Sequence, residues 1–350
     1  FHLRKGVRFH ADDAFGRPGR TRTVVASDVA FSLNRALRPG GVGASLLTDV
    51  LEGGSAVNTG TATEASGIRV VDESTLEIRL LKPYASLLER LALPFFFIVP
   101  REVVEAHGDS YGRHPVGTGP FRLAEVRPGQ LVRLDKNTDY WKRDGNGKRL
   151  PYLDGVEYRV LSDPQIALSE FRGGRLDAVD VPPVLASSVL EDGKLLPRYG
   201  RYRLQTTVAL DVHFFAFRMD RPPFFGNLAL RQALNLGVDK AKISSILLNG
   251  LGIPAVGVLP PTVYAEKERS AAYPFDPNEA RKKLVEAGYP GGKGLPELVL
   301  AIDDKATTEA VAQFVQSSLL ELGIRIKLRK SDFNTLLGDK MAIVSAKPQT

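Results

Sequence analysis

The segment that decides the fold reads Pro115-Val116-Gly117-Thr118-Gly119-Pro120-Phe121, and Asn137-Thr138-Asp139-Tyr140-Trp141 begins sixteen residues after Phe121. The two glycines allow backbone angles that other residues avoid, and Pro120 fixes the direction in which the chain leaves the turn. Apolar residues recur over 121–126 and again over 131–134, with Pro128-Gly129 between them. This spacing predicts a β-hairpin.

The sequence from residue 218 onward alternates helical and strand patterns, as is typical of an α/β domain. Parallel strands need a crossover connection, so the last three patterns predict a right-handed, parallel β-α-β unit. The expected elements are a helix over 228–248 interrupted near Gly237, a helix from Pro277 capped by Asp276 and Glu279, a strand over 298–302, a helix over 307–322 and a strand over 324–328.

The sequence before residue 218 reads as hairpins and short helices. Its strand patterns alternate apolar and polar residues, and turn-forming residues separate them. The expected elements are a strand over 1–9, a helix over 27–37 capped by Ser27, a hairpin over 68–80, helices over 83–92 and 166–171, and strands over 156–160, 178–181 and 211–217.

The composition is ordinary for a globular protein and excludes several classes. The 350 residues, 43% of them hydrophobic and 25% charged, are enough for two or three domains. The absence of cysteine excludes disulfides, thiolate metal sites and cysteine nucleophiles. The net charge of +7 is spread along the chain and interleaved with acidic residues, so we expect no nucleic-acid partner.

The search for catalytic motifs is negative. The five histidines show no metal-ligand spacing, and no G-x-S-x-G motif is present. Gly291-Gly292-Lys293-Gly294 lacks the leading glycine and the hydroxyl residue of a phosphate loop. Asp144-Gly145-Asn146-Gly147 would place Leu153, not glutamate, at position twelve of a calcium loop. We therefore expect a binding protein without catalytic residues, metal or cofactor; the alternative is a hydrolase on a two-lobed α/β scaffold.

The turn and hairpin also closely resemble the signature of a known family, the peptide and nickel class of extracellular solute-binding proteins. These proteins are the ligand-capturing subunits of ABC importers. Six further segments resemble landmarks of the same family in the same order: residues 1–10, 27–35, 151–156, 173–177, 223–239 and 276–289.

The resemblance implies an α/β, two-lobed periplasmic binding protein of the type II kind with an accessory α+β domain, incomplete here at both ends. Residues 1–100 would belong to the accessory domain, residues 101–217 to a discontinuous lobe I, and residues 218–350 to lobe II. It implies a monomer, periplasmic or extracellular, free or lipid-anchored, whose signal region is missing from this chain. The expected partners are a small solute and an ABC importer permease. The solute expected is a peptide; an oligosaccharide, a nickel chelate or an opine would also fit.

Three segments are expected to face the ligand. The predicted aromatic strand carries His213 and Phe215, which are either ligand contacts or strand packing. The loop from Asp303 to Thr307 follows a strand, and open α/β sheets bind ligands at strand carboxyl ends. Asp303 is alternatively a solvated residue at a helix entry. Phe333 matches an aromatic pocket wall of oligopeptide binders, with a core position as the alternative. The family's amine-anchoring Trp-x-x-Asp strand would lie after residue 350.

Overall fold

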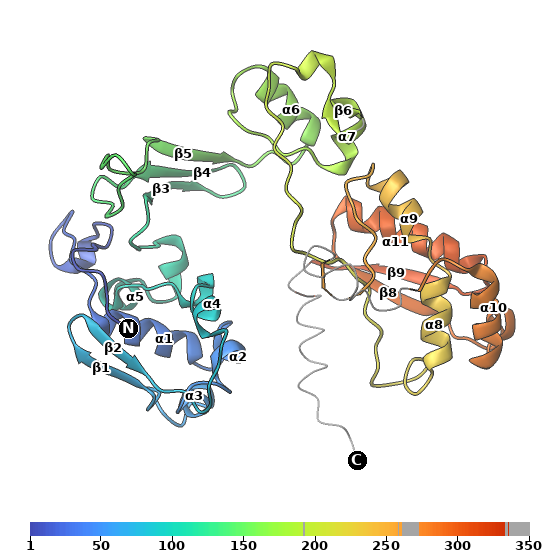
Figure 1. Ribbon diagram of the computed structural model, residues 1–350, viewed down its shortest axis with the longest axis horizontal. Helices are drawn as coiled ribbons and strands as arrows, with labels where there is room; N and C mark the ends of the chain where they lie inside the picture. Colours follow the sequence, from blue (N-terminus) through green and yellow to red (C-terminus); the bar gives the residue numbers. More distant parts are fainter. Residues whose placement is uncertain (192, 258, 261–272, 333–334, 336–350) are drawn as a thin grey trace. The chain divides into compact units, whose positions relative to one another are not determined.

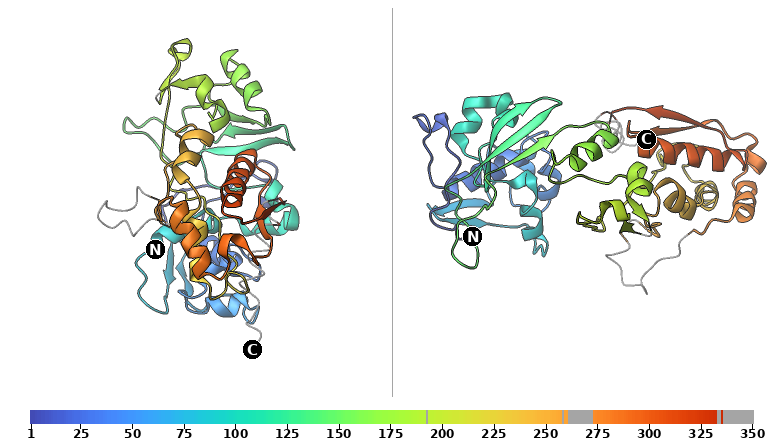
Figure 2. Two further views of the ribbon diagram at one scale, coloured as in Figure 1. Left: turned by 90° about the vertical axis from the view of Figure 1, so that its right-hand side faces the viewer. Right: turned by 90° about the horizontal axis from the view of Figure 1, so that it is seen from above.

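The computed structural model describes residues 1–191, 193–257, 259–260, 273–332 and 335. The chain divides into two compact units, Phe1–Ser162 and Asp163–Thr350, drawn in Figure 1 and Figure 2. The predicted division into an accessory domain and two lobes remains a prediction. Within the described ranges, no helix combines the length and the apolar character needed to cross a membrane.

The first unit is built around helix α1 (Ala26–Leu37). The prediction of Ser27 as cap was wrong: Val25 is the N-cap residue, and the Asp28 carboxylate in the first turn accepts a hydrogen bond from the Val25 amide (2.9 Å). Leu33 and Leu37 pack in a core with Leu76 of the hairpin formed by β1 (Ile68–Asp72) and β2 (Thr75–Ile78). The remaining helices of the unit are α2 (Ala44–Leu47), α3 (Gly54–Asn58), α4 (Leu87–Leu91) and α5 (Arg101–His107).

The strand predicted over residues 1–9 does not form as a continuous strand. The structure has only two isolated bridges here, from His2 to Thr75 and from Arg8 to Thr23. The two ends of the segment thus pair with different parts of the unit, and an alternating sequence pattern does not reveal this. Phe9 is buried at the end of the segment.

The predicted hairpin is confirmed as part of an antiparallel sheet. Its strands are β3 (Phe121–Arg127) and β4 (Leu131–Lys136), and β5 (Gly155–Arg159) pairs with the other edge of β4. Gly129 at the turn has a φ of 71°, which favours glycine.

The Gly117-Thr118-Gly119 turn ties this sheet to the start of the chain. The Nδ1 atom of His10 accepts a hydrogen bond from the Gly117 amide (3.5 Å), and its Nε2 atom lies 3.0 Å from the Gly119 carbonyl oxygen. The side chain of Asn137 donates to the same carbonyl (2.9 Å). The residues of the opening motif therefore form one hydrogen-bonded junction.

A partly buried ion-pair network holds the loop after Phe9 in place. The guanidinium of Arg22 donates two hydrogen bonds of 2.7 Å to Asp28 and two more, of 2.8 and 2.6 Å, to Glu102 of α5. Hydrogen bonds from Arg22 lower the pKa of the Glu102 carboxyl. One side chain thus joins the loop to α1 and α5.

The second unit begins with a small helical layer. Helices α6 (Pro164–Arg172) and α7 (Pro183–Val189) enclose a cluster that includes Leu168 and Leu185, beside the short pair β6 (Leu190–Glu191) and β7 (Lys194–Leu195). The strand predicted over 178–181 does not form, because Val179 packs against this cluster from irregular chain.

The predicted β-α-β unit is confirmed in order and in strand direction. Strand β8 (Leu298–Ile302) leads through α11 (Ala306–Leu320) to β9 (Ile326–Lys330), which pairs with β8 in parallel from Leu298↔Ile326 to Ile302↔Lys330. Strand β9 begins two residues later than expected. Helix α10 (Pro277–Glu286) is capped by Asp276 as expected and packs on α8 (Leu228–Leu236). The predicted interruption after α8 is also present, before α9 (Lys240–Lys242) and a π-helical turn over Ile243–Leu247.

Leu284 of α10 should be essential to the core of this unit. Its side chain is fully buried, so Leu284→Ala should lower the free energy of unfolding by about 2–5 kcal/mol through lost burial and the cavity left behind. Val285 is the matched control: it is adjacent in the same helix but 62% exposed, and Val285→Ala should cost under about 0.5 kcal/mol. Urea unfolding followed by circular dichroism measures both, and similar losses would contradict this packing.

His10 should make the stability of the first unit depend on pH. Burial lowers the pKa of His10 below its usual 6.5, so the unfolded chain takes up a proton at a higher pH than the folded chain. The stabilisation is therefore complete above about pH 6.5 and decreases as the pH falls toward the folded pKa. The variant His10→Gln should show a smaller decrease in melting temperature between neutral and mildly acidic pH. An unchanged pH profile in this variant would contradict the role of His10.

Candidate ligand-binding site

The candidate site lies at the carboxyl ends of β8 and β9. The parallel register brings the end of β8 beside the end of β9, and the Ser331 amide continues the pairing with a hydrogen bond to the Ile302 carbonyl oxygen (3.1 Å). Three residues separate the end of β8 from the start of α11, which carries Thr307 in its first turn. In Figure 1, α11 runs beside the two strands. The structure thus brings together Asp303, Thr307 and Ser331 at one edge.

The carboxylate of Asp303 is largely turned into its own loop. One oxygen accepts a hydrogen bond from the Lys305 amide (3.3 Å), and the other lies 3.8 Å from the Lys305 ammonium. The side chain is only 13% exposed. Asp303 therefore orders the turn into α11, and its contact with a ligand remains a prediction.

Thr307 and Ser331 offer hydroxyl groups at the same edge. Thr307 is exposed, and its hydroxyl makes no hydrogen bond with any described residue. The Ser331 hydroxyl oxygen is buried and makes no hydrogen bond in the described part of the chain. Buried hydroxyl groups normally have a hydrogen-bond partner, so Ser331 is an exception among the described residues.

An ion pair closes one side of this edge. The Lys330 ammonium lies 2.6 Å from the carboxylate of Glu309, so it connects the last residue of β9 to the first turn of α11. The pair is partly exposed, so we expect it to contribute little to the free energy of unfolding. Its effect is to fix the position of the first turn of α11 beside the end of β9.

A second part of the candidate site is the segment over residues 203–217. The strand predicted over 211–217 is wrong: the residues are extended, but their backbone makes no hydrogen bond with the described residues. A strand needs a paired neighbour, and the sequence pattern cannot supply one. The segment is anchored at one end by Phe217, whose ring packs on Phe224 with centroids 5.1 Å apart.

His213 and Phe215 lie on the exposed part of this segment. The His213 side chain is 89% exposed and is 3.3 Å from the carboxylate of Asp211, so it is not a buried packing residue. Phe215 is 38% exposed, and its neighbour Phe214 is 74% exposed. No hydrogen bond, ion pair or ring contact among the described residues joins this segment to Asp303 or Thr307. Phe333, the remaining predicted contact, lies outside the described residues.

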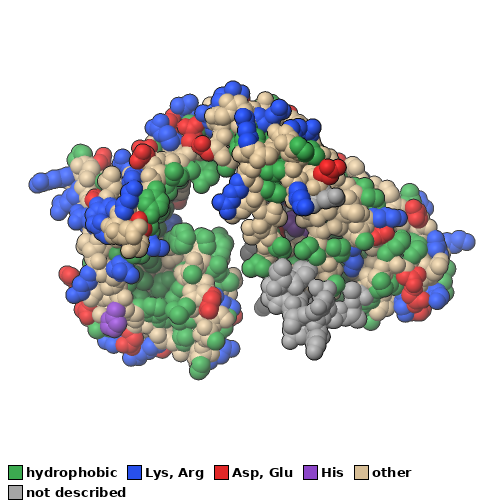
Figure 3. Space-filling view, turned by 45° about the horizontal axis from the view of Figure 1, so that its top comes forward, with side chains coloured by type: hydrophobic (Ala, Val, Ile, Leu, Met, Phe, Trp, Pro, Cys, Tyr) green, Lys and Arg blue, Asp and Glu red, His purple; other side chains and the backbone are tan. Residues whose placement is uncertain are grey.

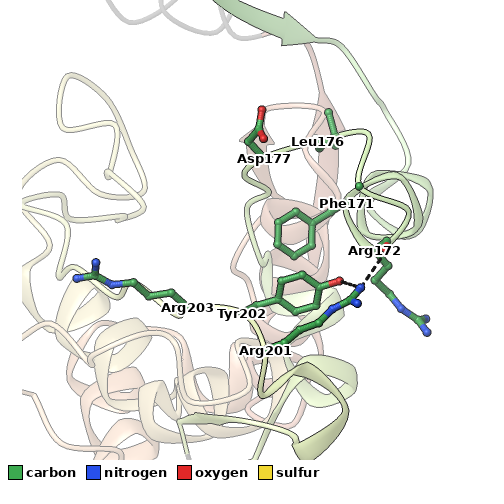
Figure 4. Close-up of a pocket in the computed structure, with 8 residues that line it drawn as sticks. Phe171, Arg172, Leu176, Asp177, Arg201, Tyr202 and Arg203 are labelled. Atoms are coloured by element: carbon green, nitrogen blue, oxygen red, sulfur yellow. Dashed lines mark hydrogen bonds between the residues drawn. The ribbon is translucent and has the colours of Figure 1, made fainter. Parts of the chain in front are cut away.

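A separate cavity lies beside α6, where residues 173–177 form a loop. It has a volume of about 420 Å³ and is lined by Phe171, Arg172, Gly174, Leu176, Asp177, Arg201, Tyr202 and Arg203. Figure 4 shows the Phe171 and Tyr202 rings next to each other; their centroids are 4.6 Å apart and their planes are tilted by 43°. The guanidinium groups of Arg172 and Arg203 point away from these rings. Because the charges do not converge, we place the candidate site at the strand ends.

Sequence reasoning missed Ser331 as a site residue. Its buried hydroxyl depends on the register of β9 against β8, which no local pattern specifies. The available signal was its position directly after a strand that runs parallel to β8, opposite Asp303.

Comparisons with known proteins identify the family. A profile described as "Bacterial extracellular solute-binding proteins, family 5 Middle" matches residues 1–346, so the chain belongs to this family. The chain is 30% identical over 297 residues to heme-binding protein A of Haemophilus influenzae, covering 83% of this chain and 51% of that protein. It is 28% identical over 282 residues to the glutathione-binding protein GsiB of Salmonella choleraesuis, covering 80% and 51%.

Solved structures agree on the fold. A periplasmic oligopeptide-binding protein of Borrelia burgdorferi has a TM-score of 0.76 at 25% identity, over 98% of this chain and 65% of that one. The oligopeptide-binding protein AppA of Bacillus subtilis, at 22% identity, has a TM-score of 0.73 over 96% of this chain and 63% of that one. The predicted two-lobed α/β fold class is confirmed. The chain spans about half the length of the curated relatives described above.

Ser331→Ala should leave the melting temperature unchanged or raise it. The variant removes a buried hydroxyl that has no described partner, and an unsatisfied buried polar group costs about 1–3 kcal/mol. Ser32→Ala is the control, because the buried Ser32 hydroxyl donates to the Asp28 carbonyl oxygen (2.7 Å) and accepts from the Val99 amide (3.0 Å). The control should be destabilised. Equal destabilisation of both variants, measured by scanning calorimetry, would show that Ser331 has a structural partner.

Proposed function

We propose that the whole protein captures a small extracellular solute between two lobes and delivers it to the permease of an ABC importer. Family membership supports this proposal, as does the similarity to proteins named for binding heme, glutathione and oligopeptides. The solute we favour is a short peptide. We also propose that the protein acts in the periplasm or outside the cell as a monomer, with or without a lipid anchor.

The observation that carries the proposal is the set of unused polar groups at the ends of β8 and β9. The hydroxyls of Thr307 and Ser331 have no described partners, and Asp303 orders the loop between β8 and α11. Such groups can hold the carbonyl and amide groups of a peptide. The backbone over residues 203–217 forms no hydrogen bond with the described residues and offers further donors and acceptors to an extended chain.

Binding without turnover is the second part of the proposal. No candidate nucleophile, base or metal cluster emerges from the sequence, and the relatives named above are binding proteins. Ligand contact with both lobes would favour a closed state, which requires a higher affinity for that state than for the open one. The competing functions are binding of an oligosaccharide, nickel chelate or opine, and hydrolysis.

Isothermal titration calorimetry of the whole protein should detect binding of short peptides, with glutathione, an oligosaccharide, a nickel chelate and an opine as competing ligands. Thr307→Val and Ser331→Ala should each lower the affinity for the preferred ligand about 3- to 10-fold. This loss corresponds to one hydrogen bond of about 0.5–1.5 kcal/mol. Ser245→Ala is the control, because the exposed Ser245 hydroxyl bonds only to its own helix, at the Ala241 carbonyl oxygen.

Mass spectrometry of the recovered ligand tests turnover. Intact peptide after prolonged incubation agrees with the proposal. Steady hydrolysis that is abolished by a single substitution would replace it with the hydrolase alternative, and preferred binding of a non-peptide ligand would change the solute class.

A further inference from the structure

The loop over residues 137–154, here called the Trp141 loop, is an ordered surface feature of the first unit that the proposed function does not use. It connects β4 to β5 without regular secondary structure. The Asp144 carboxylate accepts hydrogen bonds from the amides of Asn146 (2.9 Å) and Lys148 (2.8 Å) and from the Tyr152 hydroxyl (2.6 Å). The Leu150 amide donates to the Lys142 carbonyl oxygen (3.1 Å). These bonds give the loop one defined shape.

This fixed shape exposes apolar side chains. Tyr152 is 60% exposed and Leu153 is 62% exposed, and Trp141 at the start of the loop is 39% exposed. The Leu153 side chain belongs to none of the hydrophobic clusters among the described residues. A rigid loop that keeps large apolar side chains in water suggests a surface that is covered in use.

Cations surround the same side chains. The Arg4 guanidinium lies 4.7 Å from the centre of the Trp141 ring, and the Lys148 ammonium lies 5.2 Å from that of Tyr152. Cations therefore sit at the level of the aromatic rings. The other exposed cations nearby in the chain are Lys5, Lys142, Arg143 and Arg149. Figure 3 shows Lys and Arg side chains projecting from the surface of this unit.

The acidic residues of the loop are engaged locally. Asp144 is bonded within the loop, Asp139 lies 3.9 Å from Arg149, and Asp154 lies 3.6 Å from Lys136. Six cations, counting Arg4 and Lys5, thus face three acids that already have partners. The free charge of the surface is positive.

We propose that the Trp141 loop, together with Arg4 and Lys5, docks on the surface of an anionic phospholipid membrane. Tyrosine and tryptophan favour the level of the lipid headgroups, where their rings meet both apolar and polar surroundings. Lysine and arginine can lay their aliphatic stems on the apolar side and keep their charges at the headgroups. Negatively charged lipids attract basic residues near the surface. An acidic protein would satisfy the charges but gives no reason for the exposed Leu153 that follows the exposed Tyr152 in the loop.

Trp141 is the only tryptophan of the 350 residues, so its fluorescence reports directly on the loop. We would mix the full 350-residue chain with vesicles of phosphatidylcholine alone, and with vesicles of equal parts phosphatidylcholine and phosphatidylglycerol. Anionic vesicles should shift Trp141 emission to shorter wavelength, and the protein should sediment with them. High salt should weaken this binding. Neutral vesicles should have little effect.

Two variants test the contributions of charge and apolar contact. Lys142→Glu combined with Lys148→Glu should weaken vesicle binding roughly tenfold or more, because each cation near an anionic surface contributes severalfold. Leu153→Ser should reduce the wavelength shift. The control combines Lys293→Glu with Lys327→Glu, two exposed lysines of the other unit, and should bind like the unsubstituted chain. Circular dichroism would establish that each variant is folded.

Several results would overturn the proposal: no emission shift with anionic vesicles, equal binding to neutral vesicles, or equal weakening by the control pair. A Trp141 shift produced by soluble polyglutamate but not by vesicles would instead assign the surface to an acidic protein partner.

Discussion

The parallel pairing of β8 with β9 is the constraint on which the candidate site depends. Parallel strands cannot be joined by a tight turn, so the chain must cross over through α11. That crossover places the loop after β8, the first turn of α11 and the residue after β9 at one edge. Asp303, Thr307 and Ser331 are therefore neighbours because of strand direction, although they span 29 positions of the chain. The packing of α8 and α10 stabilises the layer that holds this edge.

Much of the fold could be predicted because its signals are local. Pro128-Gly129 marks the hairpin between β3 and β4, and Asp276-Pro277 marks the start of α10. The β-α-β unit follows from two buried strand patterns around an amphipathic helical one. The hairpin turn and the start of α10 need only neighbouring residues to form, and the β-α-β unit shows as an order of three local patterns, so a single sequence carries enough information. The family resemblance added the two-lobed architecture, which no local pattern contains.

Features that depend on distant partners could not be predicted in this way. Residues 211–217 have the alternation and aromatic content of a strand, yet they pair with no described residue. Residues 1–9 do have pairing partners, but their two ends bridge to different segments, so no continuous strand forms. Helix α1 begins before Ser27, and its first turn is held by Asp28, which also binds the distant Arg22 side chain. In the candidate site, Asp303 and Thr307 could be proposed because they follow a predicted strand. Ser331, whose hydroxyl has no described partner, could be recognised only once the register of β9 against β8 was known.

The central claim is that the ends of β8 and β9 form the ligand-binding edge of this solute-binding protein. Hydrogen–deuterium exchange of the whole protein, with and without a bound short peptide, tests it most directly. The account predicts that peptide slows exchange over residues 303–307, at Ser331 and along residues 203–217, while α10 remains unchanged. Tight peptide binding without protection at residues 303–307 and Ser331 would contradict the account, because the ligand would then be held elsewhere.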